Sequence, residues 1–226
     1  MSTRTDPPAG LRERKKIKLR RTIQAEALRL FETQGYEQTT VEQIAEAAET
    51  STTTFYRYFP TKEDVVLDDD YDPIIEATIA SRPAGEALTD TFRAAATAVA
   101  AATETDQDNN LARLNLIGTS LALDARYAAE QRRSIDLIAR LLADRAGRSE
   151  GDYQVQLTAA AFIAVLSTAS RRWAADGGAI PFTVLVDQAV TFAEPLLTAL
   201  EHPSAAKISA GFGAGAETNP ESGRTT

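Results

Sequence analysis

The segment over residues 21–66 constrains the fold most, because apolar residues at helical spacing alternate there with turn and capping residues. Apolar residues at i, i+4, i+7 and i+8 predict one buried face of a helix over residues 15–34. These residues are Ile23, Ala27, Leu30 and Phe31. Gly35 follows directly, and glycine ends a helix at low cost because it adopts left-handed backbone angles. The segment therefore predicts a compact unit of short helices.

A second helix is predicted to follow Thr40. Thr40 and Gln43 have the spacing of a capping box, in which each side chain satisfies the free backbone N–H of the other residue. The apolar residues behind this cap share one helix face. They are Val41, Ile44, Ala45 and Ala48.

A third helix is predicted to begin after Ser51 as N-cap and to end at Phe59, before Pro60. Phe55 and Phe59 are four residues apart and should point into the core. The opposite face is short and polar, and it can donate hydrogen bonds, as a reader of the DNA major groove must. Its residues are Thr52, Thr53, Tyr56 and Arg57. Thr61 is then expected to cap a fourth short helix, near residues 62–67.

The charge is divided unequally along the chain. The net charge of −8 separates into +1 for residues 1–66 and −9 for the rest, and residues 12–21 alone carry 7 basic side chains. Charge within a Debye length of about 10 Å governs phosphate contact, so an acidic total does not exclude a DNA-binder. A solvated tail is the alternative interpretation of the basic run. Its position directly before the predicted helices favours DNA.

Several classes of site and location are excluded or not expected. Since the chain has no cysteine, disulfides, thiolate zinc sites, iron–sulfur clusters and cysteine nucleophiles are excluded. The polar start does not resemble a signal peptide, and no uninterrupted apolar run approaches the roughly 18 residues that span a bilayer. We therefore expect a cytoplasmic protein without a membrane association and without a cofactor.

The rest of the chain predicts a larger helical domain over residues 67–202, so the expected fold class is all-α. Helices are expected near residues 85–103, 108–124, 125–146, 151–176 and 181–200, and Asp72 is expected to cap a helix restarting at Pro73. The aspartates near Asp72 admit a metal site as an alternative, but neighbouring carboxylates on a helix diverge. Residues 1–14 should form a flexible basic arm and residues 203–226 a disordered tail.

The last two predicted helices, over residues 155–173 and 182–200, are apolar on more sides than one core requires. A second copy of the chain would bury the additional surface, which predicts a homodimer. Pro195 predicts a kink or an early end of the final helix.

At this point two strings resemble a known family. R-T-I-x-x-E-A-L-R-L-F-x-x-Q-G-Y-x-x-T-T-V-x-x-I-A-E-A-A and T-T-T-F-Y-R-Y-F-P-T-K-E-D-V, within residues 20–66, are similar to the DNA-binding domain of the TetR family of bacterial repressors. The resemblance implies phosphate contacts from Thr40, Tyr56 and Lys62. It also implies base or groove contacts at Thr52, Thr53, Thr54, Arg57 and Tyr58. Arg57 alone in this set can bind a guanine with two hydrogen bonds, with a phosphate contact as its alternative. Tyr58 has a second alternative, which is to cover the core.

Glu49 departs from the family pattern, which usually has glycine in the turn between the second and third helices. A non-glycine residue at positive φ costs about 1–2 kcal/mol. Either the turn differs here, or its carboxylate points away from the DNA.

The size of the larger domain predicts an effector cavity with mostly apolar walls. Candidate lining residues are Phe92, Asn115, Leu116, Tyr127, Phe162 and Trp173. Core packing is the alternative role for each aromatic residue. The string F-Y-R-Y-F-P-T-K-E-D-V-V, with D-D-Y-D-P shortly after it, resembles the TetR subgroup that includes mycofactocin-type regulators, which implies an acyl-CoA-like effector.

Together these features predict a homodimeric repressor that binds double-stranded DNA at a palindromic operator and leaves it when a small molecule binds. Half-sites would lie about 34–36 Å apart. Two alternatives remain, a protein-interaction module whose helix–turn–helix no longer binds DNA, and an enzyme. For an enzyme, His202 is the only histidine, and no nucleophile and base have a recognisable spacing.

Overall fold

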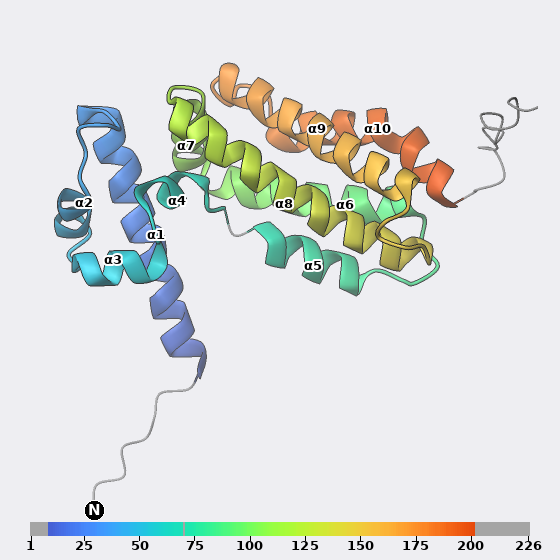
Figure 1. Ribbon diagram of the computed structural model, residues 1–226, viewed down its shortest axis with the longest axis horizontal. Coiled ribbons are helices and arrows are strands. Elements are labelled where there is room, and N and C mark those ends of the chain that lie inside the picture. The colour runs from blue at the N-terminus through green and yellow to red at the C-terminus, as the bar shows by residue number, and fades with distance from the viewer. Residues whose placement is uncertain (1–8, 70, 202–226) are drawn as a thin grey trace, which may run out of the picture.

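The structure is a computed structural model that describes residues 9–69 and 71–201. These ranges contain ten α-helices and no strand, so the all-α prediction is confirmed. Figure 1 shows two parts, with α1 to α4 on one side and α5 to α10 on the other. We call residues 9–67 the head and residues 71–201 the larger domain.

The head packs three short helices against one long helix. Its elements are α1 (Ala9–Gln34), α2 (Val41–Ala47), α3 (Thr52–Tyr58) and α4 (Lys62–Leu67). Ile23, Ile44, Phe55 and Phe59 are fully buried in one core between them, as their spacing predicted. Leu28 is also buried there, whereas Leu30 of the predicted stripe is only partly buried.

Local caps hold the short helices in place. Thr40 and Gln43 form the predicted capping box at α2, with 2.9 Å between Thr40 N and Gln43 Oε1. At α3, Thr54 N donates to Ser51 Oγ at 3.1 Å. Thr61 caps α4, and its own N–H donates to Asp64 Oδ2 at 2.8 Å. Helices of six or seven residues are marginal alone, so these caps and the shared core stabilise them together.

The first helix begins earlier than predicted, at Ala9 instead of residue 15. The basic run consists mainly of Arg, Lys and Leu, which favour helix, and Arg14 Nε donates to Gly10 O at 2.9 Å. The predicted flexible arm, residues 1–14, is therefore helical over residues 9–14. Its first eight residues lie outside the described ranges, as does the predicted tail over residues 203–226.

The larger domain is a bundle of six helices. They are α5 (Tyr71–Ser81), α6 (Leu88–Thr105), α7 (Gln107–Ile117), α8 (Leu121–Ala146), α9 (Tyr153–Ala175) and α10 (Phe182–Glu201). Helix α10 packs against α6 and α9, α8 packs against α9, and α5 packs against α6. Phe92, Leu142, Val155 and Leu197 are fully buried between them.

The break between α7 and α8 differs from the prediction, which placed it after residue 124. Helix α7 ends at Ile117, and both the N–H and the hydroxyl of Thr119 donate to Leu116 O, at 3.0 and 2.7 Å. A turn-forming Gly-Thr-Ser sequence over residues 118–120 was the signal that the periodicity argument passed over.

One further expectation was wrong, and of the two outcomes predicted at Pro195, a kink or an early end, only the early end is excluded. Helix α5 begins at Tyr71, so Asp72 lies inside it; the carboxylate of Asp69 accepts the Tyr71 N–H instead, at 3.3 Å. Helix α10 does not end early at Pro195 but continues to Glu201.

By length and composition alone α10 is apolar enough to cross a membrane, a test that a core helix of a soluble protein also passes. Its contacts with α6 and α9 are those of a core helix.

Candidate DNA-binding face and effector cavity

Helix α3 presents a polar outer face because its two phenylalanines point inward. Phe55 and Phe59 are fully buried, whereas Thr53, Tyr56 and Arg57 are exposed on the other side. The Tyr56 side chain is 51% exposed even though its ring edge meets the ring of Phe55. This face can reach a groove without moving the core.

Most of the other candidate DNA-binding side chains are partly buried or make contacts within the head. The Arg57 guanidinium lies 5.4 Å from the centroid of the Tyr58 ring, and Tyr58 is partly buried against the head core. The Thr54 hydroxyl oxygen accepts from Ser51 Oγ at 3.0 Å, so it belongs to the cap of α3. Thr52 is partly buried, while Thr40 is exposed at the start of α2, where its hydroxyl oxygen accepts the Gln43 N–H.

Lys62 is held inside the head. Its Nζ donates to Tyr36 O at 2.9 Å and to Thr39 O at 3.3 Å, and it lies 4.2 Å from the Tyr36 ring centroid. A lysine at a helix N-terminus is unfavourable for the helix dipole, and these contacts within the head compensate for that cost. An ammonium has three donors, so one N–H remains for DNA.

Tyr36 continues this arrangement on the other side of the same loop. Its hydroxyl donates to Glu63 Oε1 at 2.9 Å. Burial, together with this hydrogen bond, raises the pKa of Tyr36 well above its usual value, so the hydroxyl stays protonated and donating. The loop between α1 and α2 is thus tied to the start of α4 at two points.

Glu49 adopts the left-handed backbone conformation, with φ of 51°, and it is the one non-glycine residue at positive φ in the described ranges. Thr50 N donates to Ala45 O at 2.8 Å and Glu49 N donates to Glu46 O at 3.0 Å. This is the Schellman arrangement that ends a helix, with glutamate where glycine is usual. Glu49 therefore adopts the positive φ that glycine usually supplies, and its side chain is exposed.

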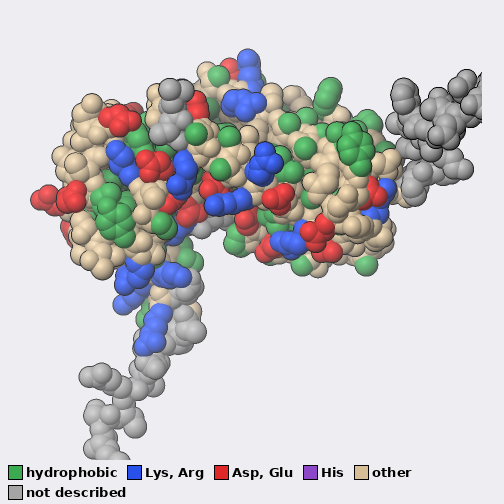
Figure 2. All heavy atoms as spheres, in the orientation of Figure 1, with side chains coloured by type: hydrophobic (Ala, Val, Ile, Leu, Met, Phe, Trp, Pro, Cys, Tyr) green, Lys and Arg blue, Asp and Glu red, His purple; other side chains and the backbone are tan. Residues whose placement is uncertain are grey.

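A basic stripe runs along the first half of α1. Arg12, Arg14, Lys15, Lys16, Lys18 and Arg21 are exposed, and Figure 2 shows blue side chains gathered on this projecting part of the molecule. Arg20 differs because it forms an ion pair with Asp68 and lies 5.1 Å from the Phe59 ring centroid. The stripe extends the positive charge beyond α3, in the direction of the N-terminus.

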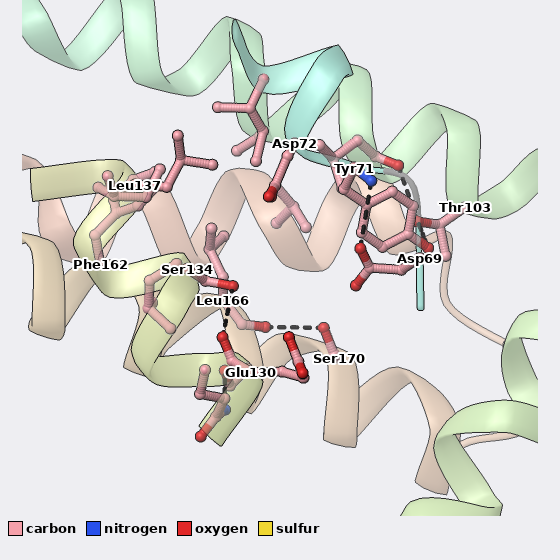
Figure 3. Close-up of a pocket in the computed structure, with 18 of the residues that line it drawn as sticks. Asp69, Tyr71, Asp72, Thr103, Glu130, Ser134, Leu137, Phe162, Leu166 and Ser170 are labelled. Carbon is pink, nitrogen blue, oxygen red and sulfur yellow. Dashed lines mark hydrogen bonds between the residues drawn. The ribbon is translucent and has the colours of Figure 1, made fainter. Parts of the chain in front are cut away.

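The larger domain contains a cavity of about 170 Å³ between α5, α6, α8 and α9. Its apolar walls include the rings of Phe92 and Phe162, whose centroids are 5.7 Å apart. Figure 3 shows Phe162 and Leu137 on one side of this space, and Glu130 and Ser170 on another. Phe182 and Val186, from α10, complete the lining.

One side of the cavity is polar. We define the polar wall as the oxygen- and nitrogen-bearing residues of the lining. They are Asp69, Tyr71, Asp72, Thr103, Arg113, Tyr127, Glu130, Gln131, Ser134, Ser167 and Ser170. Arg113 is buried, and its guanidinium lies 3.8 Å from the Asp69 carboxylate and 3.3 Å from the Tyr71 hydroxyl.

Two carboxylates of this wall, those of Asp69 and Asp72, have raised pKa values although both residues are partly exposed to solvent. Burial raises the pKa of Asp69, opposed by Arg113. Burial also raises the pKa of Asp72, and repulsion from Glu76 and Glu130 adds to the effect. Within residues 9–69 and 71–201 no three acidic, His or Cys side chains are placed to hold a metal ion.

Comparisons with known proteins agree with this geometry. The family described as bacterial regulatory proteins, tetR family, matches residues 23–68, and the MftR C-terminal domain matches residues 86–198. The transcriptional regulator TcmR of Streptomyces glaucescens is 37% identical over 182 residues, which are 76% of this chain and 80% of TcmR. The chain belongs to the TetR family of transcriptional regulators.

Solved structures show the same fold. A TetR-family regulator from Syntrophomonas wolfei aligns with a TM-score of 0.62 at 21% identity, covering 81% of this chain and 96% of the other. FadR of Thermus thermophilus, a TetR-family repressor solved in complex with lauroyl-CoA, aligns with a TM-score of 0.53 at 24% identity, covering 77% and 93%. At these identities the likeness concerns the fold alone.

The family assignment confirms the resemblance noted in the sequence, including the mycofactocin-regulator type of the second domain. This TetR-family regulator therefore carries a DNA-binding helix–turn–helix in the head and a ligand-binding larger domain. The enzyme and the non-binding interaction module were the alternatives, and the family is one of transcriptional regulators.

The structure brings only some of the predicted ligand residues to the cavity. Phe92, Tyr127 and Phe162 line it, whereas Asn115, Leu116 and Trp173 do not. Asn115 is exposed, and Leu116 packs against the core of the head. Trp173 is fully buried beside the cavity, with its ring centroid 5.1 Å from that of Phe182.

The polar wall was largely missed by the sequence argument. It uses residues on α5 to α9 that are spread over some 100 positions, and no single motif joins them. The aspartates before α5 were noticed, but as caps or metal ligands. Asp69 instead pairs with Arg113, and Asp68 with Arg20.

Helix α4 connects the two parts of this regulator. Val65 and Val66 are fully buried between the head and the larger domain, in a core that also includes Ile117 and Leu123. At its far end Leu67 lines the cavity. Two polar contacts fix it further: Gln24 Nε2 donates to Val65 O at 2.9 Å, and the Arg126 side chain donates to the Asp64 carboxylate.

An exposed apolar face covers α9 and α10. We define it by Tyr153, Leu157, Val184 and Phe192, the large apolar side chains of these helices that remain exposed. Phe192 is 81% exposed and Tyr153 78% exposed, although both lie on helices that form the bundle core on their other sides.

Proposed function

We propose that the protein is a homodimeric, cytoplasmic repressor that binds a palindromic DNA operator and leaves it when a small molecule fills the cavity. The observation that carries this proposal is the position of α4. Its first residue, Lys62, holds the loop between α1 and α2, and its last residue, Leu67, lines the cavity. A ligand that displaces Leu67 therefore moves the helix on which the head is mounted.

The apolar face supports the dimer. Phe192 and Tyr153 expose large apolar areas to water, and a second copy of the same face would cover them by twofold symmetry. One head offers a single short recognition helix, α3. Two heads related by a twofold axis would bind half-sites about 34–36 Å apart on one side of the duplex.

The contacts with DNA follow from the outer face of the head. Arg57, Tyr56 and Thr53 are the exposed side chains of α3, so they would enter the major groove or meet its edges. Thr40, Thr52, Thr54, Tyr58 and Lys62 complete the proposed set; Lys62 would offer its third N–H to a phosphate. The basic stripe on α1 would add contacts that depend on salt and not on sequence.

Release requires that the effector bind one arrangement of the heads more tightly than the other, because equal binding shifts no equilibrium. The ion pair between Asp64 and Arg126 joins α4 to α8, and Asp68 with Arg20 joins the end of α4 to α1. These pairs transmit a shift of α4 in both directions. The subgroup resemblance implies an acyl-CoA-like effector, which is one candidate class of small molecule for this cavity. Its acyl chain suits the apolar walls, while its phosphates would meet three carboxylates and one arginine.

Selection of random duplexes on the purified protein, followed by binding measurements at two salt concentrations, tests the proposal. We expect an enriched palindrome, an affinity that falls as salt rises, and a mass in solution of two chains. Enrichment of no sequence, with no salt-dependent binding to any duplex, would contradict it.

The coupling through α4 has its own test. Arg126→Gln removes the ion pair with Asp64, and the matched control Arg132→Gln changes an exposed arginine of the same helix that has no partner among the described residues. We expect Arg126→Gln to keep operator affinity but to reduce the release caused by a ligand recovered from the purified protein. Equal release from the two variants would remove this ion pair from the mechanism.

A further inference from the structure

Three hydroxyl groups of the polar wall, those of Ser134, Ser170 and Thr103, have already donated their protons. Ser134 Oγ donates to Glu130 O at 3.3 Å, and Ser170 Oγ donates to Leu166 O at 3.1 Å. The hydroxyl of Thr103 has Val99 O and the Tyr71 hydroxyl as partners, both at 2.9 Å. Since a hydroxyl has one proton, these oxygens offer a ligand only their acceptor lone pairs. The Ser167 hydroxyl accepts from Gln131, and it donates no hydrogen bond within residues 9–69 and 71–201, nor does the Tyr127 hydroxyl.

The carboxylates of the wall are also acceptors, and one of them has no partner. Asp72 makes no hydrogen bond and no ion pair within residues 9–69 and 71–201, and Figure 3 shows its carboxylate pointing into the space between the helices. The nearest cation that acts on it, Arg140, is paired with Glu76 at 2.9 Å. Glu130 pairs only with Arg133, whose side chain is 75% exposed, and such pairs in water contribute little.

Nitrogen donors on the same wall are few, and both side chains that carry them are engaged. Gln131 Nε2 donates to Ser167 Oγ at 2.6 Å. Arg113 is engaged by Asp69 and by the hydroxyl and ring of Tyr71. An anionic ligand would therefore meet one occupied arginine among three carboxylates. Such a ligand would be repelled by these carboxylates.

These three observations assign a charge to the ligand. We infer that the effector is an apolar or aromatic molecule that carries a protonated amine, with its apolar body against Phe92 and Phe162 and its ammonium group at Asp72 and Glu130. This inference rests on the proposed function of the cavity as the effector site. It adds the chemical class of the effector, and it replaces the acyl-CoA-like class.

The ammonium group supplies what the wall lacks. It donates up to three hydrogen bonds to oxygens that can only accept, and it neutralises the unpaired Asp72. Partial burial, together with repulsion from Glu76 and Glu130, raises the pKa of Asp72 even though the residue is exposed, so a cation that binds there also removes a cost.

Four probes of equal chain length test the inference: decylamine, decanol, decanoate and decanoyl-CoA. The protein has a single tryptophan, Trp173, whose ring contacts the cavity residue Phe182, so its fluorescence reports occupation. Calorimetry gives the dissociation constants independently. We expect decylamine to bind at least about tenfold more tightly than decanol, decanoate or decanoyl-CoA, and to lower operator binding.

Variants locate the charge. The double variant Asp72→Asn with Glu130→Gln should lose the preference for decylamine over decanol while it keeps decanol affinity. Asp136→Asn is the matched control, because Asp136 is an exposed carboxylate of the same helix as Glu130 and does not line the cavity. It should leave every affinity unchanged. Retained decanol affinity in the double variant shows that the variant is folded.

The outcomes separate the two proposals. Tighter binding of decanoate or decanoyl-CoA than of decylamine, with release of the operator, would overturn the amine and leave the effector site in place. Equal affinities for decanol and decylamine would also overturn the amine and leave the effector site in place. If no probe binds the cavity or changes operator binding, the effector function of the cavity fails, and the inference fails with it.

Discussion

The head and the larger domain are both helical, but they differ in how completely each satisfies its own surfaces. In the head, each of the three short helices has a side-chain cap, and Ile23, Ile44, Phe55 and Phe59 fill the core, while Leu11, Ile17 and Tyr56 are the large apolar residues that stay exposed. The larger domain has long helices, a cavity of about 170 Å³ and an uncovered apolar face. The head has a filled core, whereas the larger domain leaves room for a ligand and for a second copy of the chain.

The difference follows from helix length. Helices of six or seven residues are not stable without caps and a filled core, so the head tolerates little empty space. Helices of 23 and 20 residues, such as α9 and α10, bury enough on one side to leave other sides unfilled. In this chain the head, with its filled core, is suited to a target of fixed shape, DNA. The larger domain, with its cavity and exposed apolar face, is suited to partners that bind reversibly.

The apolar face gives the largest expected effect. Phe192→Glu places a charge in the proposed contact between copies, so we expect a monomer and a loss of operator affinity of about 100-fold or more. Light scattering and duplex binding measure the two results. Ala77→Glu is the control, since Ala77 is exposed on α5, which Figure 1 places across the bundle from α9 and α10. If the Phe192→Glu protein remained a dimer, the exposed apolar face would not be the contact between copies.

The outer face of the head gives the next effect. Arg57→Ala should cost about 1–3 kcal/mol of operator affinity if Arg57 binds a guanine, and discrimination at one base pair should relax. Arg132→Ala, which removes an equal charge from the larger domain, should leave operator binding unchanged. Titrations against the operator and single-base variants measure both. Equal losses on all sequences, with a lower salt slope, would assign Arg57 to a phosphate instead.

The inside of the head is tested by Lys62→Met, which keeps the length of the side chain and removes its ammonium group. Because Nζ donates to Tyr36 O and Thr39 O, we expect the free energy of unfolding to fall by about 1–3 kcal/mol in urea titrations. The salt slope of operator binding tests the third donor. Unchanged stability with a reduced slope would mean that Lys62 serves the DNA and not the head.

The smallest effect concerns the strained turn. Glu49→Gly places glycine at φ of 51°, so we expect the head to gain about 1 kcal/mol in unfolding experiments, less the entropy that glycine adds to the unfolded chain. Glu46→Gly is the control, because residue 46 lies inside α2, where glycine destabilises. A loss of stability in Glu49→Gly would show that the carboxylate has a role beyond the turn.

Much of the head was determined by its sequence alone. Capping boxes at Thr40 and Thr61, the N-cap Ser51 and the turn at Gly35 act within three or four residues, so local sequence is enough to place them. The buried faces of α2 and α3 follow from spacing for the same reason. Long-range contacts decided the rest: Lys62 reaches the carbonyl oxygens of Tyr36 and Thr39, more than twenty residues away, and no local pattern announces such a bond.

Only the tertiary structure decided the composition of the cavity. Residue type alone predicted six lining residues. Phe92, Tyr127 and Phe162 do line the cavity, but Asn115, Leu116 and Trp173, predicted on the same grounds, lie elsewhere. The sequence also did not predict the negative charge of the cavity lining, because nothing in the local sequence around Asp72 or Glu130 indicates that these carboxylates line a cavity. Helical periodicity defines which side of a helix is buried. Which helices then face one another depends on how all six pack, because a cavity is enclosed by faces that the chain brings together only when it folds.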